Sequence, residues 1–476
     1  MNADPRHRLF AEHALLPAGW ARDVLLGWDD AGTLTEVSVA AAPPPGVPRA
    51  AGMLISGMPN LHSHAFQRAF AGLTECRGPG PDPRADSFWS WRDLMYRFAL
   101  VVSPDQLEAI ATQLYIEMLH AGYTAVCEFH YLHHDPQGRP YADPAEMSLR
   151  LLAAAQRAGI GITLLPVLYQ QAGFGAQAAR ADQRRFVNSV DALLAIVERV
   201  RAHGARVCAG VGARGAARVG VAAHSLRAVG PQALREVVAG THAIDASAPI
   251  HIHIAEQAQE VQDCIAWSGQ RPVAWLLANT NVDARWCLVH ATHLNDAESN
   301  GIASSGAVAG LCPTTEANLG DGVFDAVAHL AANGAWGIGS DSHASVGPAE
   351  ELRLLETTQR LAQQRRNVLA SDAHPQVADR MWLGAVSGGA RAGGRAIGGL
   401  AVGQQADFVV LDTAGTLAGL APSQALASHV FTNHGRSAVR DVWVAGQPRI
   451  IEREHALDRA ACERFVAARH QLLSEV

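Results

Sequence analysis

The sequence contains no lysine, and arginine supplies all 38 of its basic residues. Mechanisms that need a primary amine are therefore excluded: a Schiff base, a pyridoxal phosphate linkage and a phosphate-binding P-loop. The same absence excludes a lysine carbamate that bridges two metal ions. These exclusions hold whatever the cause of the arginine-only composition.

Cysteine is sparse, and positive charge does not dominate. The seven cysteines are never spaced CxxC, which argues against a disulfide framework or a thiolate zinc site and favours a reducing compartment. The net charge of −7 comes with no basic stripe, which argues against nucleic acid or an anionic membrane as a partner. No segment approaches the ~18 apolar residues of a membrane span, and the N-terminal region has no signal-peptide pattern. The composition predicts a soluble, cytoplasmic protein.

The pattern of apolar residues divides the chain into a barrel and a small β domain. Within residues 54–398, eight short apolar strands alternate with amphipathic helical segments, which predicts an α/β fold with a TIM-like (β/α)₈ barrel. Residues 1–53 and 399–476 alternate as antiparallel strands do, and the second segment ends in a helix. We expect the two chain ends to build one small β-sandwich domain. The expected barrel strands are Leu54–Met58, Thr124–Glu128, Ile162–Val167, Val219–Ala223, Ile250–Ile254, Cys287–His290, Ala307–Cys312 and Trp336–Ser340.

Polar side chains gather at the ends of these strands. In such barrels the reactive groups lie where strands end and βα loops begin. Six of the eight expected strands run into a residue that can bind metal or move protons, whereas the strands that end at 167 and 312 do not. The residues concerned are His62, His64, Glu128, His130, His224, His251, His253, Glu256, His290 and Asp341.

The pair His62 and His64 is the first candidate metal site. In extended backbone the two imidazoles of an HxH pattern point to one side, because the side-chain period is two. Two neutral imidazoles that converge on one cation suit Zn²⁺. Asp341 follows a glycine-rich strand, where a carboxylate can ligate the same metal and accept a proton from its water. A helix cap is the alternative role for this aspartate.

The segment from His251 to Glu256 supplies a second candidate. His251 and His253 share a face, so spacing alone does not decide which binds metal, although we expect His251 to be a packed residue. Glu256 leaves the strand end and can transfer protons if burial raises its pKa. His290 is a stronger catalytic candidate than His224, since it ends a distinct strand. The spacing predicts a mononuclear hydrolase or deaminase in which three histidines and one aspartate hold one Zn²⁺ with a position open for water.

These motifs resemble the amidohydrolase superfamily. Within it, the segments Met58–Arg68, Ser87–Arg92, Glu128–Tyr131, His224–Ala228 and His251–Gln257 are similar to the N-formimidoyl-L-glutamate deiminase family of histidine degradation. The resemblance implies that a water activated by one zinc ion attacks the formimidoyl carbon and that N-formyl-L-glutamate and ammonia are formed. It implies zinc on His62, His64, His253 and Asp341, and catalytic roles for Glu256, His290 and Asp341. It also implies substrate contacts by Gln67, Arg92, Tyr131, His224 and Arg227, and a homodimer.

Two arginines suit a substrate with two carboxylates, because a guanidinium binds a carboxylate through two hydrogen bonds. Three alternatives stay open. A related enzyme could deaminate a purine, pyrimidine or triazine ring, or cleave the other C–N bond of the same substrate to give formamide and glutamate. A barrel without catalysis could act as a scaffold. The ligand set also accepts Fe²⁺ or Mn²⁺, and the surface loop 76–85, longer than expected for the family, lies near Arg92.

Overall fold

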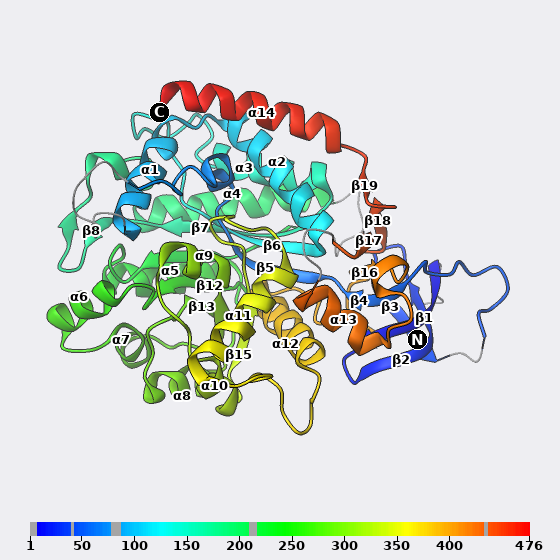
Figure 1. The fold of residues 1–476 in the computed structure, drawn as a ribbon. Helices are drawn as coiled ribbons and strands as arrows, with labels where there is room; N and C mark the ends of the chain where they lie inside the picture. Colours follow the sequence, from blue (N-terminus) through cyan, green and yellow to red (C-terminus); the bar gives the residue numbers. More distant parts are fainter. Residues whose placement is uncertain (1–6, 40–41, 78–86, 209–216, 433–436) are drawn as a thin grey trace.

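Most strands of the protein form a parallel barrel and a smaller mixed sheet beside it (Figure 1), and β8 (Gln171–Gly173) pairs with β9 (Gln177–Ala178) in a separate two-stranded sheet. The computed structural model describes residues 7–39, 42–77, 87–208, 217–432 and 437–476. It confirms the predicted (β/α)₈ barrel with a small β domain built from both chain ends. The loop predicted at 76–85 lies, from residue 78 on, outside the described residues. Among the residues described, no helix has the length and apolarity needed to cross a membrane.

The barrel strands pair in the order of the sequence, and each is parallel to its neighbours. A parallel bridge between Ser63 and Asp341 closes the ring between the last strand and the first. The two-residue strand β10 (Arg218–Val219) adds to one barrel strand, β7. The eight barrel strands are β5 (Met58–Ser63), β6 (Tyr123–His130), β7 (Gly161–Leu168), β11 (Val221–Ser225), β12 (Ile250–Ile254), β13 (Trp286–His290), β14 (Val308–Leu311) and β15 (Ala335–Ile338).

The prediction of one barrel strand over Leu54–Met58 is wrong. The segment is two strands: β4 (Met53–Ser56) pairs in the small sheet, and β5 begins the barrel. Gly57 stands between them, and a Cβ at this position would lie 2.2 Å from the side chain of Thr124. The chain can pass this closely from one sheet to the other because glycine has no side chain.

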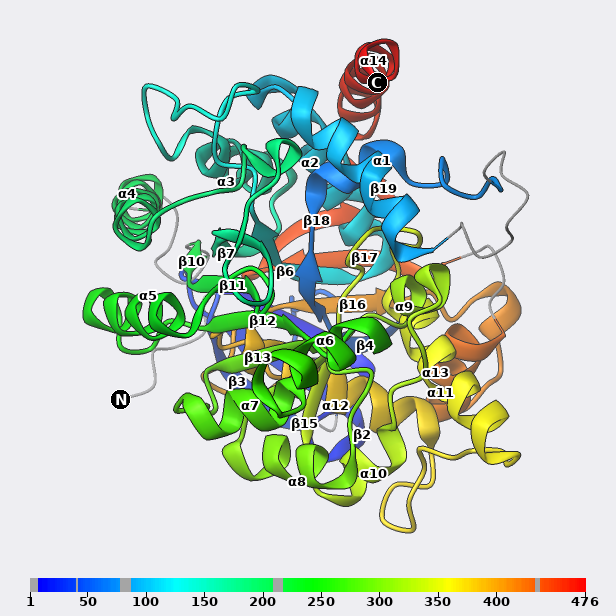
Figure 2. The same ribbon diagram turned by 90° about the vertical axis from the view of Figure 1, so that its left-hand side faces the viewer.

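Helices surround the barrel, as Figure 2 shows. The helix α2 illustrates how the sequence sets their ends. Ser103 caps the helix by accepting from the N–H of Gln106, and Pro104 stands at its first position. Gly122 ends it with a φ of 100°, which glycine adopts readily. The helices are α1 (Phe88–Val101), α2 (Pro104–Ala121), α3 (Glu146–Ala158), α4 (Val190–Cys208), α5 (Pro231–Ile244), α6 (Ala258–Ser268), α7 (Pro272–Asn279), α8 (Asp296–Ser305), α9 (Pro313–Leu319), α10 (Ala326–Ala331), α11 (Pro348–Gln363), α12 (Val377–Ala392), α13 (Pro422–Phe431) and α14 (Asp458–Glu475).

The small sheet joins the two ends of the chain. Its order is β19-β18-β17-β16-β4-β1-β2-β3, so that β4 links the N-terminal strands to the C-terminal ones. The indole N–H of Trp382 on α12 donates to the carbonyl of Ser56 at 3.1 Å and ties this sheet to the barrel. Its strands are β1 (His7–Leu16), β2 (Gly19–Trp28), β3 (Leu34–Val39), β4, β16 (Phe408–Leu411), β17 (Val439–Val444), β18 (Gln447–Ile451) and β19 (Glu454–His455).

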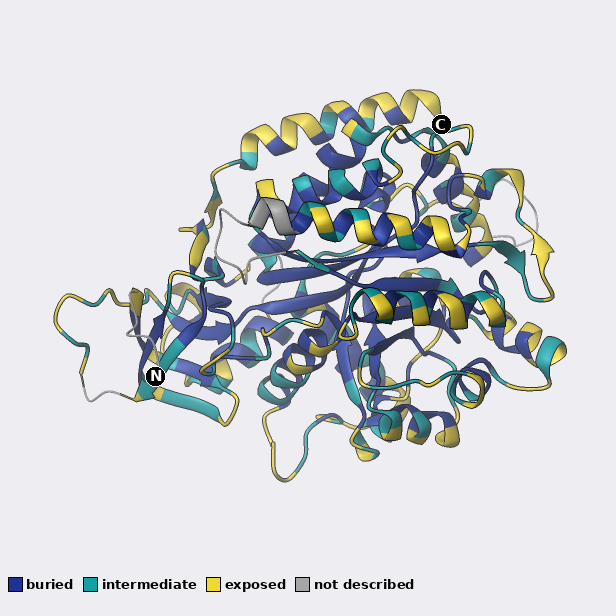
Figure 3. Cartoon of the chain, turned by 180° about the vertical axis from the view of Figure 1, so that it is seen from behind, coloured by how far each residue is buried: buried dark blue, intermediate teal, exposed yellow. Residues whose placement is uncertain are grey.

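Burial follows the layers of the fold. The eight barrel strands are buried except at His224 and Ala335, which are half-buried, whereas the helices expose their outer faces (Figure 3). The last helix, α14, lies along α2, where Asp458 and His120 approach to 2.7 Å. A barrel covered on all sides in this way places its reactive groups at the strand ends.

Candidate metal and active site

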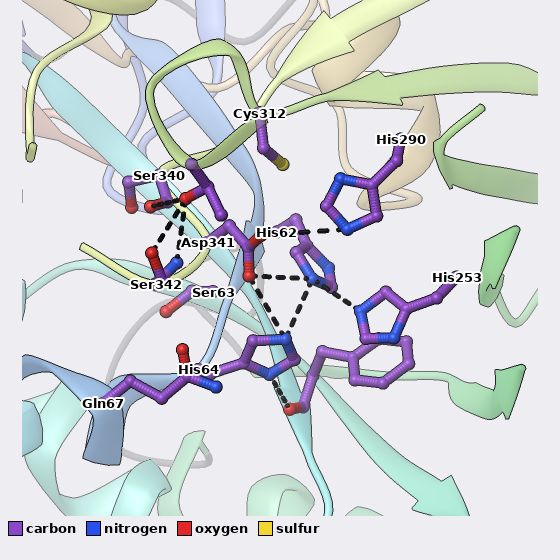
Figure 4. Close-up of polar contacts among 12 residues, drawn as sticks. His62, Ser63, His64, Gln67, His253, His290, Cys312, Ser340, Asp341 and Ser342 are labelled. Carbon is purple, nitrogen blue, oxygen red and sulfur yellow. Dashed lines mark hydrogen bonds and ion pairs between the residues drawn. The ribbon is translucent and has the colours of Figure 1, made fainter. Parts of the chain in front are cut away.

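Three imidazoles and one carboxylate converge at the carboxyl ends of the barrel strands (Figure 4). The Nε2 atom of His62 lies 3.1 Å from Nε2 of His64 and 2.9 Å from Nε2 of His253. Oδ1 of Asp341 lies 3.5 Å from the first of these nitrogens and 3.3 Å from the second. All four side chains are buried. The structure therefore brings together the four residues that the sequence analysis assigned to the metal.

The chemistry of these donors fits a divalent cation. The Nδ1–H of His64 donates to the carbonyl of Phe129 at 2.8 Å, which leaves the lone pair of its Nε2 directed at the other imidazoles. Burial lowers the pKa of His62 and His253, and it lowers the pKa of His64 to about 3, with the neighbouring His62 as the next cause. The three imidazoles are thus neutral at neutral pH, which is the state that ligates metal.

The backbone holds this cluster at the seam where the barrel closes. The N–H of Asp341 donates to the carbonyl of His62 at 3.0 Å, and the N–H of His64 donates to the carbonyl of Asp341 at 3.2 Å. Asn60 strengthens the seam: its Nδ2 donates to Oγ of Ser340 at 2.7 Å, and its Oδ1 accepts from the N–H of Ser340 at 3.1 Å. The sequence analysis did not single out Asn60, although it lies two residues before His62.

Glu256 and His290 flank the cluster. Oε1 of Glu256 lies 3.8 Å from Nε2 of His290, and its Oε2 lies 3.9 Å from the guanidinium of Arg227. Burial raises the pKa of Glu256 to about 7, although both positive neighbours oppose the rise. A carboxyl group with this pKa can donate and accept a proton at neutral pH. Burial lowers the pKa of His290, but the nearby carboxylates outweigh it and raise the value to about 10.

The predicted substrate residues line the cavity above the metal cluster. Arg92 stacks on the ring of Trp89 at 4.4 Å. Its Nε and the Nε of Arg227 are both buried and have no hydrogen-bond partner among the described residues. The amide of Gln67 donates to the hydroxyl of Tyr131 at 2.9 Å, and its Oε1 has no partner in the described part of the chain. The predicted residues that line this cavity are His64, Gln67, Arg92, Tyr131, His224, Arg227, His253, Glu256, His290 and Asp341.

Some of the polar residues predicted at strand ends lie outside the site. Glu128 accepts hydrogen bonds from Ser63 Oγ at 2.7 Å and from the hydroxyl of Tyr115 at 3.1 Å. Glu128 thus holds Ser63, the residue between His62 and His64, through a hydrogen bond. Phe129, between Glu128 and His130 on β6, faces the cluster, and its ring stacks on that of His253. Because side chains alternate along a strand, His130 points to the same side as Glu128, away from the cluster. His251 is packed as expected: its Nε2 contacts the carbonyl of Ala392 at 2.8 Å.

A parallel barrel with imidazole and carboxylate ligands at its carboxyl end is the architecture of a metal-dependent hydrolase. Residues 53–449 match the model of the amidohydrolase family, and the chain belongs to that family. It is 52% identical to the formimidoylglutamate deiminase of Pseudomonas aeruginosa over 98% of this chain and 99% of that protein.

Solved structures share the fold. The crystal structure of an amidohydrolase from Brucella melitensis is 46% identical and superposes with a TM-score of 0.91, covering 98% of this chain and 100% of that chain. An adenosine deaminase from Xanthomonas campestris, solved with bound zinc, is 24% identical, with a TM-score of 0.73 over 98% of this chain and 97% of that chain. At that identity the second likeness shows the fold alone.

Proposed function

We propose that this enzyme is a zinc-dependent formimidoylglutamate deiminase, which converts N-formimidoyl-L-glutamate and water to N-formyl-L-glutamate and ammonia in histidine degradation. The observation that carries the proposal is the pair Arg92 and Arg227, whose buried Nε atoms lack partners in a cavity beside the histidine cluster. Two guanidinium groups match the two carboxylates of the substrate. The 52% identity to a protein named for this reaction supports the same substrate.

Each group of side chains in the site has its own role in the proposed reaction. His62, His64, His253 and Asp341 would hold the metal, which when bound lowers the pKa of water to about 7. The arginines bind the carboxylates and hold the formimidoyl carbon over the cluster. Asp341 accepts the proton of the attacking water. His290 already carries a proton at neutral pH, because the nearby carboxylates raise its pKa to about 10, and it stabilises the charge that develops. Glu256 donates a proton to the nitrogen that leaves as ammonia, for which its pKa of about 7 is suited.

Product analysis tests this proposal. The zinc-loaded protein is incubated with N-formimidoyl-L-glutamate, ammonia is assayed, and the organic product is identified by NMR. Ammonia with N-formylglutamate is the expected result. Formamide with glutamate would show that the same substrate binds but that its other C–N bond is cleaved. Absence of turnover, with about one zinc per chain, would overturn the proposed substrate.

An amino-substituted ring is the second candidate substrate. The cavity is also lined by Tyr96, Tyr131 and Tyr169, and aromatic walls suit a flat ring. The two arginines argue against a neutral ring, because such a ring offers no carboxylate to pair with them. Assays with aminopurines and aminotriazines decide between the two candidates. A scaffold without catalysis would purify without stoichiometric metal.

Three further properties belong to the proposal. The metal is zinc, one per chain, since three imidazoles and a carboxylate suit it. The protein acts in the cytoplasm, where the free thiols, Cys76 and Cys462 on the surface among them, stay reduced. It forms a homodimer, which rests on the resemblance to its family. Metal analysis, fractionation of cells and light scattering test these three statements in turn.

A further inference from the structure

His290 sits on an unusual stretch of backbone. Its φ is +67° and that of the following Ala291 is +48°, a region that residues other than glycine rarely adopt. The N–H of Ala291 donates to the carbonyl of Ile254 at 3.0 Å, which turns the chain sharply at the end of β13. The turn fixes the Cα–Cβ direction of His290, but it leaves the rotation of the ring to be set by side-chain partners.

The imidazole has one hydrogen bond within the described residues. Its Nε2 lies 3.8 Å from both Glu256 Oε1 and Asp341 Oδ2, which is longer than a hydrogen bond. Its Nδ1 lies 3.4 Å from Oε1 of Glu316, in the first turn of α9. This oxygen also accepts from the backbone N–H of Cys312 at 2.8 Å, and the Glu316 side chain is buried. The acceptor for Nδ1 of His290 is thus held by the backbone of Cys312, between β14 and α9.

We propose that Glu316 is a positioning residue for catalysis. Its carboxylate accepts the Nδ1–H of His290 and so directs Nε2 into the cavity, between Glu256 and Asp341. A partner on one ring nitrogen sets the orientation in which the other nitrogen is presented. Without Glu316 the ring can rotate about its χ angles. The inference rests on the proposed function only where it assigns His290 to the reaction.

Variants of Glu316 separate this role from packing. Glu316→Ala removes the acceptor and is expected to lower kcat on the order of 10–100-fold, with KM changed by less than about threefold. Glu316→Gln keeps an oxygen for Cys312 and His290, and we expect it to restore kcat to within about fivefold of the wild type. It also guards against misfolding, since the alanine variant leaves the N–H of Cys312 unpaired.

Glu351→Gln is the matched control. Glu351 is a buried carboxylate on α11 that also binds α9, where Thr314 donates to it from its N–H at 2.9 Å and from Oγ1 at 2.6 Å. It makes no contact with His290 among the interactions of the described residues. Its replacement should leave kcat within about twofold of the wild type. An equal loss in this variant would assign the effect of Glu316 to the packing of α9.

A double-mutant cycle asks whether Glu316 acts through His290. In the His290→Ala background, Glu316→Ala should lower kcat by less than about twofold, because its partner is already missing. Losses that multiply instead would overturn the proposal. Metal content is measured for every variant, since a loss of bound metal would also place the action of Glu316 elsewhere.

Crystal structures provide a readout that does not depend on the substrate. We expect the His290 ring of Glu316→Ala to be rotated or spread over two orientations, and that of Glu316→Gln to keep the wild-type one. An unmoved ring in the alanine variant would overturn the positioning role, even in an active enzyme. If the wild type fails to convert N-formimidoyl-L-glutamate, the proposed function fails, and the ring orientation still decides the role of Glu316.

Discussion

Asp341 and His62 are joined through their backbones, at 3.0 Å from the N–H of the first to the carbonyl of the second, and their side chains meet again at 3.5 Å. The hydrogen bonds that close the barrel between β15 and β5 are therefore the same ones that set the spacing of two candidate metal ligands. Because the same hydrogen bonds close the barrel and set the spacing of these ligands, the ligands are held in place before metal binds. Such preorganisation lowers the cost of assembling a metal site.

Asp341→Asn is expected to separate the metal site from the fold. The variant keeps both backbone hydrogen bonds of the seam, so its circular dichroism spectrum should match that of the wild type. Loss of the carboxylate charge should reduce bound metal well below one ion per chain and lower kcat by at least about 10²-fold, since a candidate proton acceptor is also lost. Metal analysis after dialysis measures the first effect. Asp325→Asn, at the start of α10, removes an acid elsewhere and should retain the metal.

Glu256→Gln is expected to lower kcat on the order of 10²–10⁴-fold with metal content unchanged. The amide keeps the shape of the side chain but cannot transfer a proton, and the carboxylate lies beside His290 and Arg227, outside the candidate ligand set. Steady-state kinetics and metal analysis on the same preparation provide both numbers. Near-full activity would end the assignment of Glu256 as the proton donor. Glu236→Gln, exposed on α5, controls for the loss of a glutamate.

The sequence could place the four candidate metal ligands close together because its signals are local. An HxH pattern at a strand end and a strand that continues into Asp341 need only the pleat and the parallel order of the strands to bring the ligands together. Glu316 was missed for the opposite reason. It lies four residues beyond Cys312 on the next helix, and only the turn of that helix brings it back to His290 on the neighbouring strand.

The two faces of a buried strand were harder to tell apart. Glu128 was a candidate for metal or proton chemistry, but it faces Tyr115 on α2, while Phe129 faces the cluster. A barrel strand is buried on both sides, so the alternation of polar and apolar residues that would assign its faces is lost. The break at Gly57 was also hidden, because Leu54–Met58 has the length and pattern of one short strand. The switch between sheets depends on the close approach of Thr124 to Gly57.

Methionine replacements of Arg92 and Arg227 are expected to lower kcat/KM by about 10–100-fold each, the range for losing a charged hydrogen bond of about 1.5–3 kcal/mol. The pairing of each arginine can be read with N-formimidoyl-4-aminobutyrate, which lacks the α-carboxylate. Replacement of the arginine that binds this carboxylate should not lower kcat/KM for the analogue, whereas replacement of the other arginine should lower it as it does for the full substrate. Competition kinetics with both substrates measure the ratio. Equal losses by both variants on both substrates would contradict separate carboxylate sites.

His429 is expected to limit stability at acidic pH. It lies on α13 against Trp382, and both of its ring nitrogens are buried without a partner in the described structure. Burial lowers its pKa from 6.5 to about 4. Between these values the unfolded chain binds more protons than the folded one, so the free energy of unfolding falls as pH drops below 6.5, by about 1.4 kcal/mol per pH unit.

His429→Phe removes this penalty, so its advantage in thermal midpoint over the wild type should grow from pH 7 to pH 5. A constant difference would show that His429 does not titrate on unfolding, and His374→Gln at an exposed position is the control.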